Sequence, residues 1–156
     1  MTFMQRFFKS LWNQPWIKLK YKKAVYKKLC GYGDVPDAPF SKDFYGLQYQ
    51  GNLNNSIEFH LYYLGAFEKP LLFFLRDTLL QLKKASPQST LQFFDVGANI
   101  GQHSLFMSQH ADQVHSFEPY QAVRQKLEHH IELNKIKNIR LHPMGLSNKK
   151  EQLDFY

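Results

Sequence analysis

Hydrophobic positions change from strand-like runs to helical spacing several times in the second half of the chain. Short apolar runs at 91–96, 114–117 and 139–142 predict three strands, the first of them buried. Between them, residues 101–110 and 119–134 repeat their apolar positions every three to four residues, as amphipathic helices do. Because strands alternate with helices, the pattern predicts an α/β fold with a parallel sheet and right-handed crossovers.

Both helices between these strands have apolar faces and recognisable ends. Pro119 suits the first turn of the second helix, and Asn134 suits its C-terminal cap. The residues expected to point inward are Leu105, Phe106 and Met107 in the first helix, and Val123, Leu127, His130 and Ile131 in the second. Core positions, rather than a stacking platform for bases, are expected for Phe93, Phe94, Phe106 and Phe117.

Upstream, residues 70–84 show the clearest helical pattern of the chain. Two lysines lie in its last turn, where they favour the helix dipole. Its apolar face consists of Leu72, Leu75, Leu79 and Leu82. Residues 31–56 are rich in Gly, Pro, Asp and Asn, which predicts turns and short strands, and the alternation at 56–59 predicts a further short strand or turn.

Charge is distributed unevenly along the 156 residues. Lysine and arginine number 20 and aspartate and glutamate 13, which gives a net charge of +7. The first 28 residues contain eight of the bases and no acid, so residues 29–156 hold 12 bases and 13 acids. The basic character therefore belongs to the N-terminal segment, and the near-neutral remainder argues against a general nucleic-acid-binding protein.

This basic segment also has helical spacing of apolar positions, at 4, 7, 8 and 11 and again at 12, 16 and 19, with an expected break at Pro15. Residues 1–28 are predicted either to contact an anionic membrane surface or to dock on the body with their lysines in water. The sequence has no spanning segment, no signal-peptide core and one cysteine, Cys30. A cytoplasmic protein is expected, with peripheral membrane association as the alternative.

The clearest chemical signal lies between Phe93 and Gly101. A predicted strand runs into a loop with glycines at 97 and 101, and a helix follows directly. Glycine permits a tight turn and the close approach of a ligand, and a helix N-terminus offers free N–H groups. Open α/β sheets place ligands at such loops, at the carboxyl ends of their strands.

A carboxylate follows the second predicted strand at Glu118, 23 residues beyond Asp95. An acid near this spacing accepts ribose hydroxyls in nucleoside-binding folds, and its two oxygens match a cis-diol. In a strand–helix–strand unit the side chain is expected beside the glycine loop. The alternative is that Gly97 and Gly101 are ordinary turn glycines and that Glu118 caps the following helix.

The glycine spacing distinguishes two classes of nucleoside cofactor. NAD-binding loops have the pattern G-x-G-x-x-G around a pyrophosphate, whereas this chain has G-x-x-x-G with Asp95 two residues before Gly97. An acid there disfavours a pyrophosphate and favours a cation, such as the amino group of a methionine moiety. The loop therefore fits S-adenosylmethionine better than NAD.

Together these segments resemble the FkbM-type methyltransferases. The resemblance rests on DVGANIG at 95–101, followed by Ser104, and on FEP at 117–119. It extends over residues 45–156 and includes the lead-in at 57–68, IELN at 131–134, Asn138 and LSN at 146–148.

This resemblance implies a Rossmann-like class I methyltransferase fold, S-adenosylmethionine as cofactor, and O-methylation of a sugar, glycan or small metabolite. By position, Glu118 would hold the ribose, and Asn148 stands where the family has an acid after Ser147. The methionine moiety would be lined by Asp95, Gly97, Asn99 and Gly101. The implied cofactor-binding set also includes Ala98, Pro119, Glu68 and Ser147.

Family members continue through further strands, whereas this chain stops at Tyr156 in a segment that alternates like a strand just beginning. The expected organisation is a basic amphipathic extension and linker at 1–44, followed by a methyltransferase domain at 45–156 that is incomplete at its C-terminal end. The open sheet edge of such a half-sheet invites self-association. No catalytic base is assigned from the sequence.

Two classes of function remain open: a methyltransferase or its cofactor-binding fragment, and a non-catalytic module that binds a nucleoside or a partner protein. His103, in the first turn after the glycine loop, either borders the cofactor or is a solvated helix residue. The seven histidines show no metal-ligand spacing, because His129 and His130 point about 100° apart on a helix. No metal site is predicted.

Overall fold

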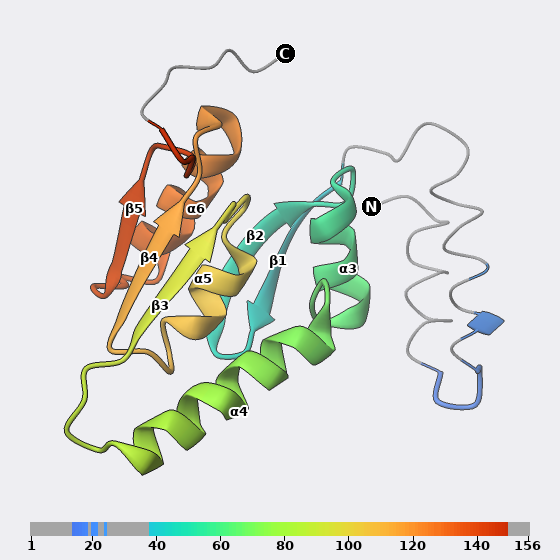
Figure 1. The fold of residues 1–156 in the computed structure, drawn as a ribbon. Helices are drawn as coiled ribbons and strands as arrows, with labels where there is room; N and C mark the ends of the chain where they lie inside the picture. The colour runs from blue at the N-terminus through green and yellow to red at the C-terminus, as the bar shows by residue number, and fades with distance from the viewer. Residues whose placement is uncertain (1–13, 19, 22–23, 25–37, 150–156) are drawn as a thin grey trace. The chain divides into compact units, whose positions relative to one another are not determined.

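The computed structural model describes residues 14–18, 20, 21, 24 and 38–149 (Figure 1). They belong to two compact units. The first contains residues 38–42 and 50–67 together with the described residues before 25, and the second contains residues 43–49 and 68–149. The proposed boundary between residues 44 and 45 stays a prediction.

Most of the basic N-terminal segment lies outside the described residues, including the predicted helical positions 4, 7, 8 and 11. Trp16 and Tyr21, which are described, are both exposed. In the part of the chain that the structure describes, no helix is long and apolar enough to cross a membrane. Membrane contact through residues 1–28 therefore stays a prediction.

Residues 38–52 form a β-hairpin. Its strands are β1 (Pro39–Phe44) and β2 (Leu47–Asn52), which pair as a two-stranded sheet. Tyr45 and Gly46 have φ values of 52° and 91°, the two consecutive positive values of a type I′ turn, whose twist matches that of paired strands. The short strands and turns expected in this region are confirmed from residue 38 onward.

Helix α3 (Ser56–Leu64) contradicts the strand or turn predicted at 56–59. The side chain of Asn55 accepts hydrogen bonds from the backbone N–H groups of Ile57 and Glu58 at 3.0 and 3.1 Å, which caps the first turn. The Glu58 side chain accepts a further bond from the N–H of Asn52. Helix α3 packs with the hairpin in a small core of Ala38, Leu53, Phe59 and Tyr63.

The second unit contains the predicted parallel sheet. Its strands follow the order β3 (Gln92–Val96), β4 (Gln113–Phe117), β5 (Ile139–His142), and both pairs are parallel. Helices α5 (Gln102–Met107) and α6 (Gln121–Leu133) connect successive strands (Figure 1). The α/β class and the strand–helix alternation are thus confirmed.

The ends of these two helices differ from the prediction. Helix α5 stops at Met107 rather than 110, and the side-chain amide of Asn138 donates to the carbonyl of Ser108 at 2.8 Å just beyond that end. Helix α6 starts at Gln121, so Pro119 precedes the helix instead of lying in its first turn. Asn134 is the C-terminal cap of α6, as predicted.

The two faces of the sheet differ in how they are covered. On the face toward α5, Val114 and Ser116 are fully buried. On the opposite face, Phe94 and Val96 remain 55% and 59% exposed, so the prediction of a buried first strand and a core position for Phe94 is wrong. Four rings stack against one another on this face, with Phe94 and His142 each stacked on both His115 and Phe117. Side chains alternate between the two faces along β3, so Phe94 and Val96 lie on the outer face, away from α5. On that face His115, Phe117 and His142 are half-buried.

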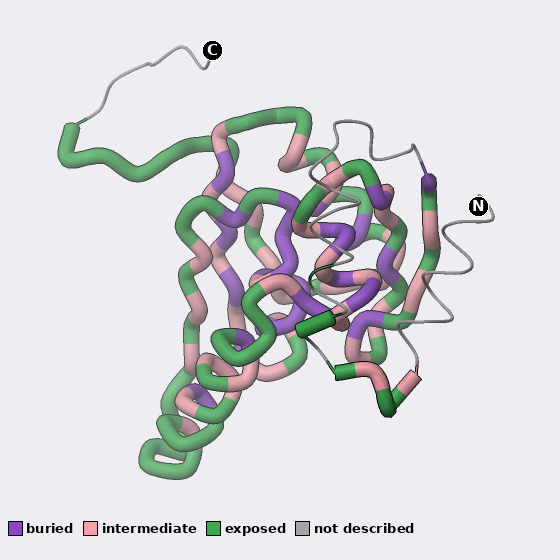
Figure 2. Tube along the Cα trace, turned by 90° about the vertical axis from the view of Figure 1, so that its right-hand side faces the viewer, coloured by how far each residue is buried: buried purple, intermediate pink, exposed green. Residues whose placement is uncertain are grey.

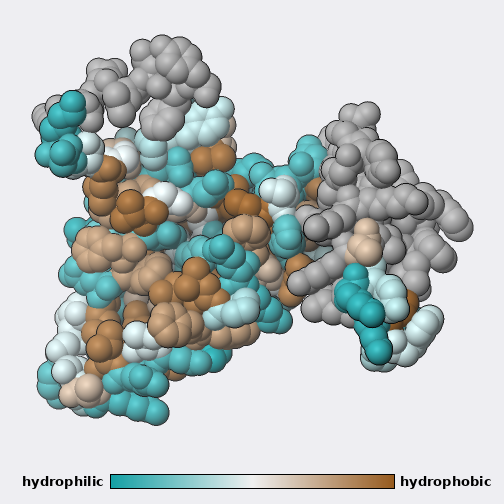
Figure 3. Space-filling view, turned by 45° about the vertical axis from the view of Figure 1, so that its right-hand side comes forward, coloured by the Kyte–Doolittle hydropathy of each residue, from teal (hydrophilic) through white to brown (hydrophobic). Residues whose placement is uncertain are grey.

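Helix α4 (Lys69–Ala85) matches the predicted helix closely in length but only in part in its buried face. Leu72 and Leu79 are buried, whereas Leu75 is half-buried and Leu82 is exposed. The last turns of this helix are mostly exposed in Figure 2. Hydrophobic atoms are visible at the surface in Figure 3, and the exposed large side chains of α4 are Leu71, Phe74, Leu80 and Leu82.

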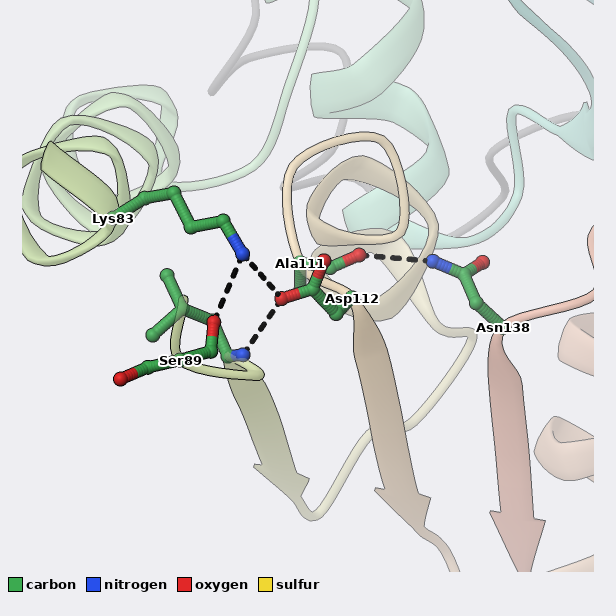
Figure 4. Close-up of polar contacts among 6 residues, drawn as sticks. Lys83, Ser89, Ala111, Asp112 and Asn138 are labelled. Atoms are coloured by element: carbon green, nitrogen blue, oxygen red, sulfur yellow. Dashed lines mark hydrogen bonds and ion pairs between the residues drawn. The ribbon is translucent and has the colours of Figure 1, made fainter. Parts of the chain in front are cut away.

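A polar network connects α4 to the amino ends of the strands (Figure 4). The carboxylate of Asp112 accepts hydrogen bonds from the ammonium of Lys83 at 3.1 Å and from the N–H of Leu91 at 2.7 Å. Lys83 also donates to the carbonyl of Ser89 at 2.9 Å. The network fixes the connection from α4 into β3 at the sheet end opposite the glycine loop.

Candidate nucleoside-binding site

The glycine loop, residues 97–101, connects the carboxyl end of β3 to α5. Gly97, Asn99 and Gly101 adopt φ values of 79°, 51° and 81°. The backbone N–H groups of Gly97 and Ala98 both donate to the carbonyl of Phe117, each at 3.0 Å. The loop is therefore tied to the end of the neighbouring strand β4, as the predicted strand–helix–strand unit requires.

Glu118 follows β4 and lies beside this loop, as expected. Its side chain is buried, its Oε2 accepts from the N–H of Asn99 at 2.9 Å, and its Oε1 accepts from the N–H of Tyr120 at 2.8 Å. Tyr120 is the N-cap residue of α6, so the carboxylate joins the glycine loop to the start of that helix. Glu118 thus lies in the position expected of a ribose acceptor and also binds at the helix start, as the alternative reading supposed.

The carboxylate of Glu118 retains capacity for further donors. A carboxylate has about four lone-pair positions, and the two backbone bonds use two of them. Among the residues that the structure describes, no cation forms an ion pair with it. Arg124, the nearest candidate in sequence, donates instead to the carbonyls of Glu118 and Pro119. A buried carboxylate without a counter-ion is stabilised by additional hydrogen-bond donors, such as hydroxyl groups.

The two loop glycines serve different purposes. A Cβ on Gly101 would lie 2.3 Å from Cδ1 of Leu127, so this glycine permits close packing of the loop on α6. A Cβ on Gly97 would meet no atom within 4 Å, so its free side faces open space. An open approach to the backbone at Gly97, next to the carboxylate of Glu118, fits a group that carries adjacent hydroxyls.

Asp95 is the penultimate residue of β3, two positions before Gly97. Its carboxylate is half-buried, and its Oδ2 accepts a hydrogen bond from the hydroxyl of Ser104 at 2.5 Å. Ser104 is fully buried on α5, and it is the serine that follows DVGANIG in the sequence resemblance. An acid held at this place provides negative charge beside the loop, which suits a ligand cation and not a pyrophosphate.

The remaining members of the predicted set occupy different settings. Asn99 is exposed, and its side chain accepts from the N–H of Ile100 within the loop, while Ala98 is buried. Glu68 is exposed at the N-cap of α4 with φ 50°, and its side chain makes no capping bond. Ser147 is exposed beyond β5, and its hydroxyl donates to Asn148 at 3.5 Å. Cofactor contacts from these residues stay predictions.

Two polar groups near the loop differ from expectation. His103 is half-buried, and its Nε2 is buried without a hydrogen-bond partner, so it is not the solvated residue that was one alternative. Ser116, fully buried on β4, was not singled out by the sequence, where one serine inside a short strand carries no pattern. Among the described residues, no group of three or more His, Cys, Asp or Glu is placed to hold a metal ion.

No protein-family model and no curated protein matches this sequence. Among solved structures, a SAM-dependent methyltransferase from Agrobacterium tumefaciens is similar at 12% identity and TM-score 0.49, over 72% of this chain and 34% of that chain. TYW2 from M. jannaschii in complex with AdoMet is similar at 14% and 0.47, over 71% and 45%. TYW2 from P. horikoshii in complex with MeSAdo is similar at 19% and 0.46, over 80% and 47%.

The chain spans between about one third and one half of the length of these structures. At such identities and scores, the similarity assigns no residue of this chain a role. FkbM membership, suggested by the sequence motifs, is not among the matches.

Proposed function

We propose that this chain binds S-adenosylmethionine at the carboxyl end of its parallel sheet and acts as the cofactor-binding part of a methyltransferase. The observation that carries the proposal is the carboxylate of Glu118, which is buried, lacks a cationic partner among the described residues, and is bonded to the glycine loop. Two hydroxyls of a ribose would supply the donors that its remaining lone pairs accept.

The rest of the loop supports the same ligand. The open side of Gly97 leaves room for the nucleoside to approach the backbone, and Asp95 places a negative charge where the amino group of the methionine moiety would lie. Asp95 also disfavours a pyrophosphate, so the dinucleotide NAD fits this arrangement less well than S-adenosylmethionine does.

When bound, S-adenosylmethionine supplies a methyl group already activated by its sulfonium. The residues of this chain would bind the cofactor and hold its reacting end in place, and positioning of this kind is a large part of catalysis in bimolecular transfers. We further propose, from the resemblance to FkbM-type proteins, that the acceptor is a hydroxyl of a sugar, glycan or small metabolite. A non-catalytic nucleoside-binding module is the second candidate, because no catalytic base is identified among the described residues.

Calorimetric titration of the full chain with S-adenosylhomocysteine tests the proposal. Wild-type protein is expected to bind saturably, and Glu118→Ala is expected to lose at least about 100-fold in affinity, because charged hydrogen bonds of about 1.5–3 kcal/mol each are removed. Glu128→Ala is the matched control, since Glu128 is a glutamate of α6 whose carboxylate pairs with Arg124 at 3.4 Å. Thermal unfolding verifies that each variant is folded.

The outcomes separate the candidates. Equal affinity of Glu118→Ala and wild type, or no binding by folded wild type, contradicts the proposal. Binding by wild type without methyl transfer to any acceptor in a panel of sugars, glycans and small hydroxylated metabolites favours the non-catalytic module.

A further inference from the structure

Two buried hydroxyl groups connect to the carboxylate of Asp95 beside the glycine loop, and we call this series of hydrogen bonds the hydroxyl relay. Ser104 on α5 and Ser116 on β4 are both fully buried, and their Oγ atoms lie 2.6 Å apart. Ser104 Oγ lies 2.5 Å from Oδ2 of Asp95 on β3. Asp95 and Ser116 are register partners on the neighbouring strands β3 and β4. The hydrogen bonds therefore connect β3, β4 and α5.

The chemistry of the groups fixes the direction of these bonds. A hydroxyl has one proton to donate, and an ionised carboxylate only accepts. Ser104 therefore donates to Asp95, and its oxygen accepts the proton of Ser116. The order Ser116, Ser104, Asp95 leaves the carboxylate at the end of a chain of aligned dipoles, an arrangement that strengthens each bond in turn.

The surroundings give no other reason for two serines at these positions. Val114, the neighbouring inner-face residue of β4, is fully buried and apolar, as expected for a position against a helix. Burying a hydroxyl costs free energy unless it is hydrogen-bonded, and alanine would fill nearly the same space without that requirement. The two hydroxyls are explained by the carboxylate to which they lead.

Only one carboxylate oxygen of Asp95, Oδ2, takes part in the hydrogen bonds with Ser104 and Ser116. Among the described residues, its Oδ1 makes no hydrogen bond and no ion pair. A carboxylate held by one oxygen in a fixed orientation presents the other to a ligand group, and Asp95 lies two residues before the loop proposed to bind the nucleoside.

We propose that Ser104 and Ser116 are positioning residues, which hold the carboxylate of Asp95 so that it recognises the ammonium group of an amino-acid-bearing nucleoside. This inference rests on the proposed function and specifies its ligand class: the site distinguishes nucleosides that carry an α-amino acid from those that do not. The selectivity comes from orientation, because a carboxylate free to rotate loses part of its hydrogen-bond energy to disorder.

Paired titrations with S-adenosylhomocysteine and 5′-methylthioadenosine test the inference, because the second ligand lacks the amino-acid part. Ser104→Ala is expected to lower the affinity for S-adenosylhomocysteine about tenfold and to change the affinity for 5′-methylthioadenosine by less than about twofold. Ser116→Ala, which leaves the Ser104–Asp95 bond in place, is expected to weaken only S-adenosylhomocysteine, by about threefold.

Two variants separate hydrogen bonding from packing. Ser104→Cys keeps nearly the same shape with a much weaker donor, so it is expected to behave like Ser104→Ala. Ser108→Ala is the matched control. Ser108 is the C-cap residue of α5, and its hydroxyl donates to the carbonyl of Leu105 rather than to Ser104, Ser116 or Asp95. Its affinities for both ligands are expected to equal those of the wild type.

The failures of the two proposals are distinguishable. If wild type binds both ligands and Ser104→Ala weakens them equally, or weakens neither, the positioning role is overturned and the proposed function stands. If Ser104→Cys binds like wild type, packing rather than hydrogen bonding is responsible and the positioning role is again overturned. If folded wild type binds neither ligand, the proposed function fails and this inference fails with it.

Discussion

The two ends of the parallel sheet each carry a carboxylate that accepts backbone N–H groups, but the two carboxylates differ in what balances their charge. At the amino end, Asp112 accepts from the N–H of Leu91 and from the ammonium of Lys83, and its side chain is 44% exposed. At the carboxyl end, Glu118 accepts from Asn99 and Tyr120, is 7% exposed, and forms no ion pair with any described residue.

This difference separates a structural carboxylate from a candidate binding group. The hydrogen bond from Leu91, followed by that from Lys83, lowers the pKa of Asp112, so its charge is matched within the protein. Glu118 has its backbone bonds but no cation, and water is largely excluded from it. Hydrogen bonds from the hydroxyl groups of a ligand are therefore expected to stabilise the carboxylate of Glu118 more than that of Asp112. Burial without a counter-ion, rather than the presence of an acid, is what distinguishes the carboxyl end of the sheet as the proposed binding end.

The largest expected effect concerns the packing that holds the carboxyl end together. Gly101→Ala would place a Cβ 2.3 Å from Leu127 at a residue with φ 81°, so both a clash and a strained backbone oppose it. We expect urea unfolding to show that the free energy of unfolding falls by about 3 kcal/mol or more. A loss below about 1 kcal/mol would mean that the loop and α6 separate easily, and the fixed geometry of the site would then be wrong.

Matched amide substitutions at the two ends test the comparison directly. Glu118→Gln is expected to lower the affinity for S-adenosylhomocysteine by about 100-fold, because the amide has one acceptor oxygen fewer and no negative charge. Asp112→Asn makes the same change at the amino end and is expected to leave the affinity within about twofold. Titration calorimetry measures both, and similar losses in the two variants would show that the ends do not differ in function.

Gly97→Ala gives the counterpart to the substitution at Gly101. Its Cβ meets no atom within 4 Å, but φ is 79°, so only the left-handed backbone opposes it, at about 1–2 kcal/mol of unfolding free energy. Because the methyl group enters the space proposed for the nucleoside, we expect S-adenosylhomocysteine affinity to fall about tenfold. Unchanged affinity in a folded Gly97→Ala protein would remove the ligand from this side of the loop.

Much of this end of the sheet was predictable, because its pattern is long and regular. The strand at 139–142 was predicted with its observed bounds, and the strand–helix–strand order alone placed Glu118 beside the glycine loop. What the order could not give is the use of the Glu118 oxygens, since their bonds to Asn99 and Tyr120 depend on the positive φ of Asn99 and on where α6 begins.

The errors have equally local causes. Ile57 and Phe59 alternate with polar residues over only four positions, too few to distinguish a strand from a helix, and the cap formed by Asn55 decided for α3. Phe94 and Val96 belong to an apolar run that reads as buried, but their exposure depends on what covers the outer sheet face, which no strand pattern states. Ser116 is a single polar residue whose role depends on Ser104, twelve residues away.

A smaller effect is expected from the ion pair at the amino end. Lys83→Met keeps most of the side-chain length and removes the ammonium that donates to Asp112 and to the carbonyl of Ser89. Exposed pairs contribute little, so urea unfolding should show only a small loss of unfolding free energy, and this loss should shrink as salt is raised. Ligand affinity should not change. A larger, salt-independent loss would indicate that the network of Figure 4 is needed for the fold itself.

The smallest expected effect is a pH dependence of stability that originates at the amino end. Burial, reinforced by the cation of Arg76 and opposed by Asp77, lowers the pKa of His110 from its ordinary value of 6.5. The folded state therefore binds this proton less readily than the unfolded state, so the stabilising contribution is complete above pH 6.5 and is lost as pH falls through the lowered folded value. Below pH 6.5, the unfolding midpoint of His110→Gln, measured by circular dichroism, should fall less steeply with decreasing pH than that of wild type.

The control is His129→Gln, at an exposed position on α6. The pH dependence of its unfolding midpoint should follow that of wild type. If both variants flatten equally, the acid sensitivity does not arise at the amino end, and the contrast between the two ends of the sheet would have to rest on Glu118 and Asp112 alone.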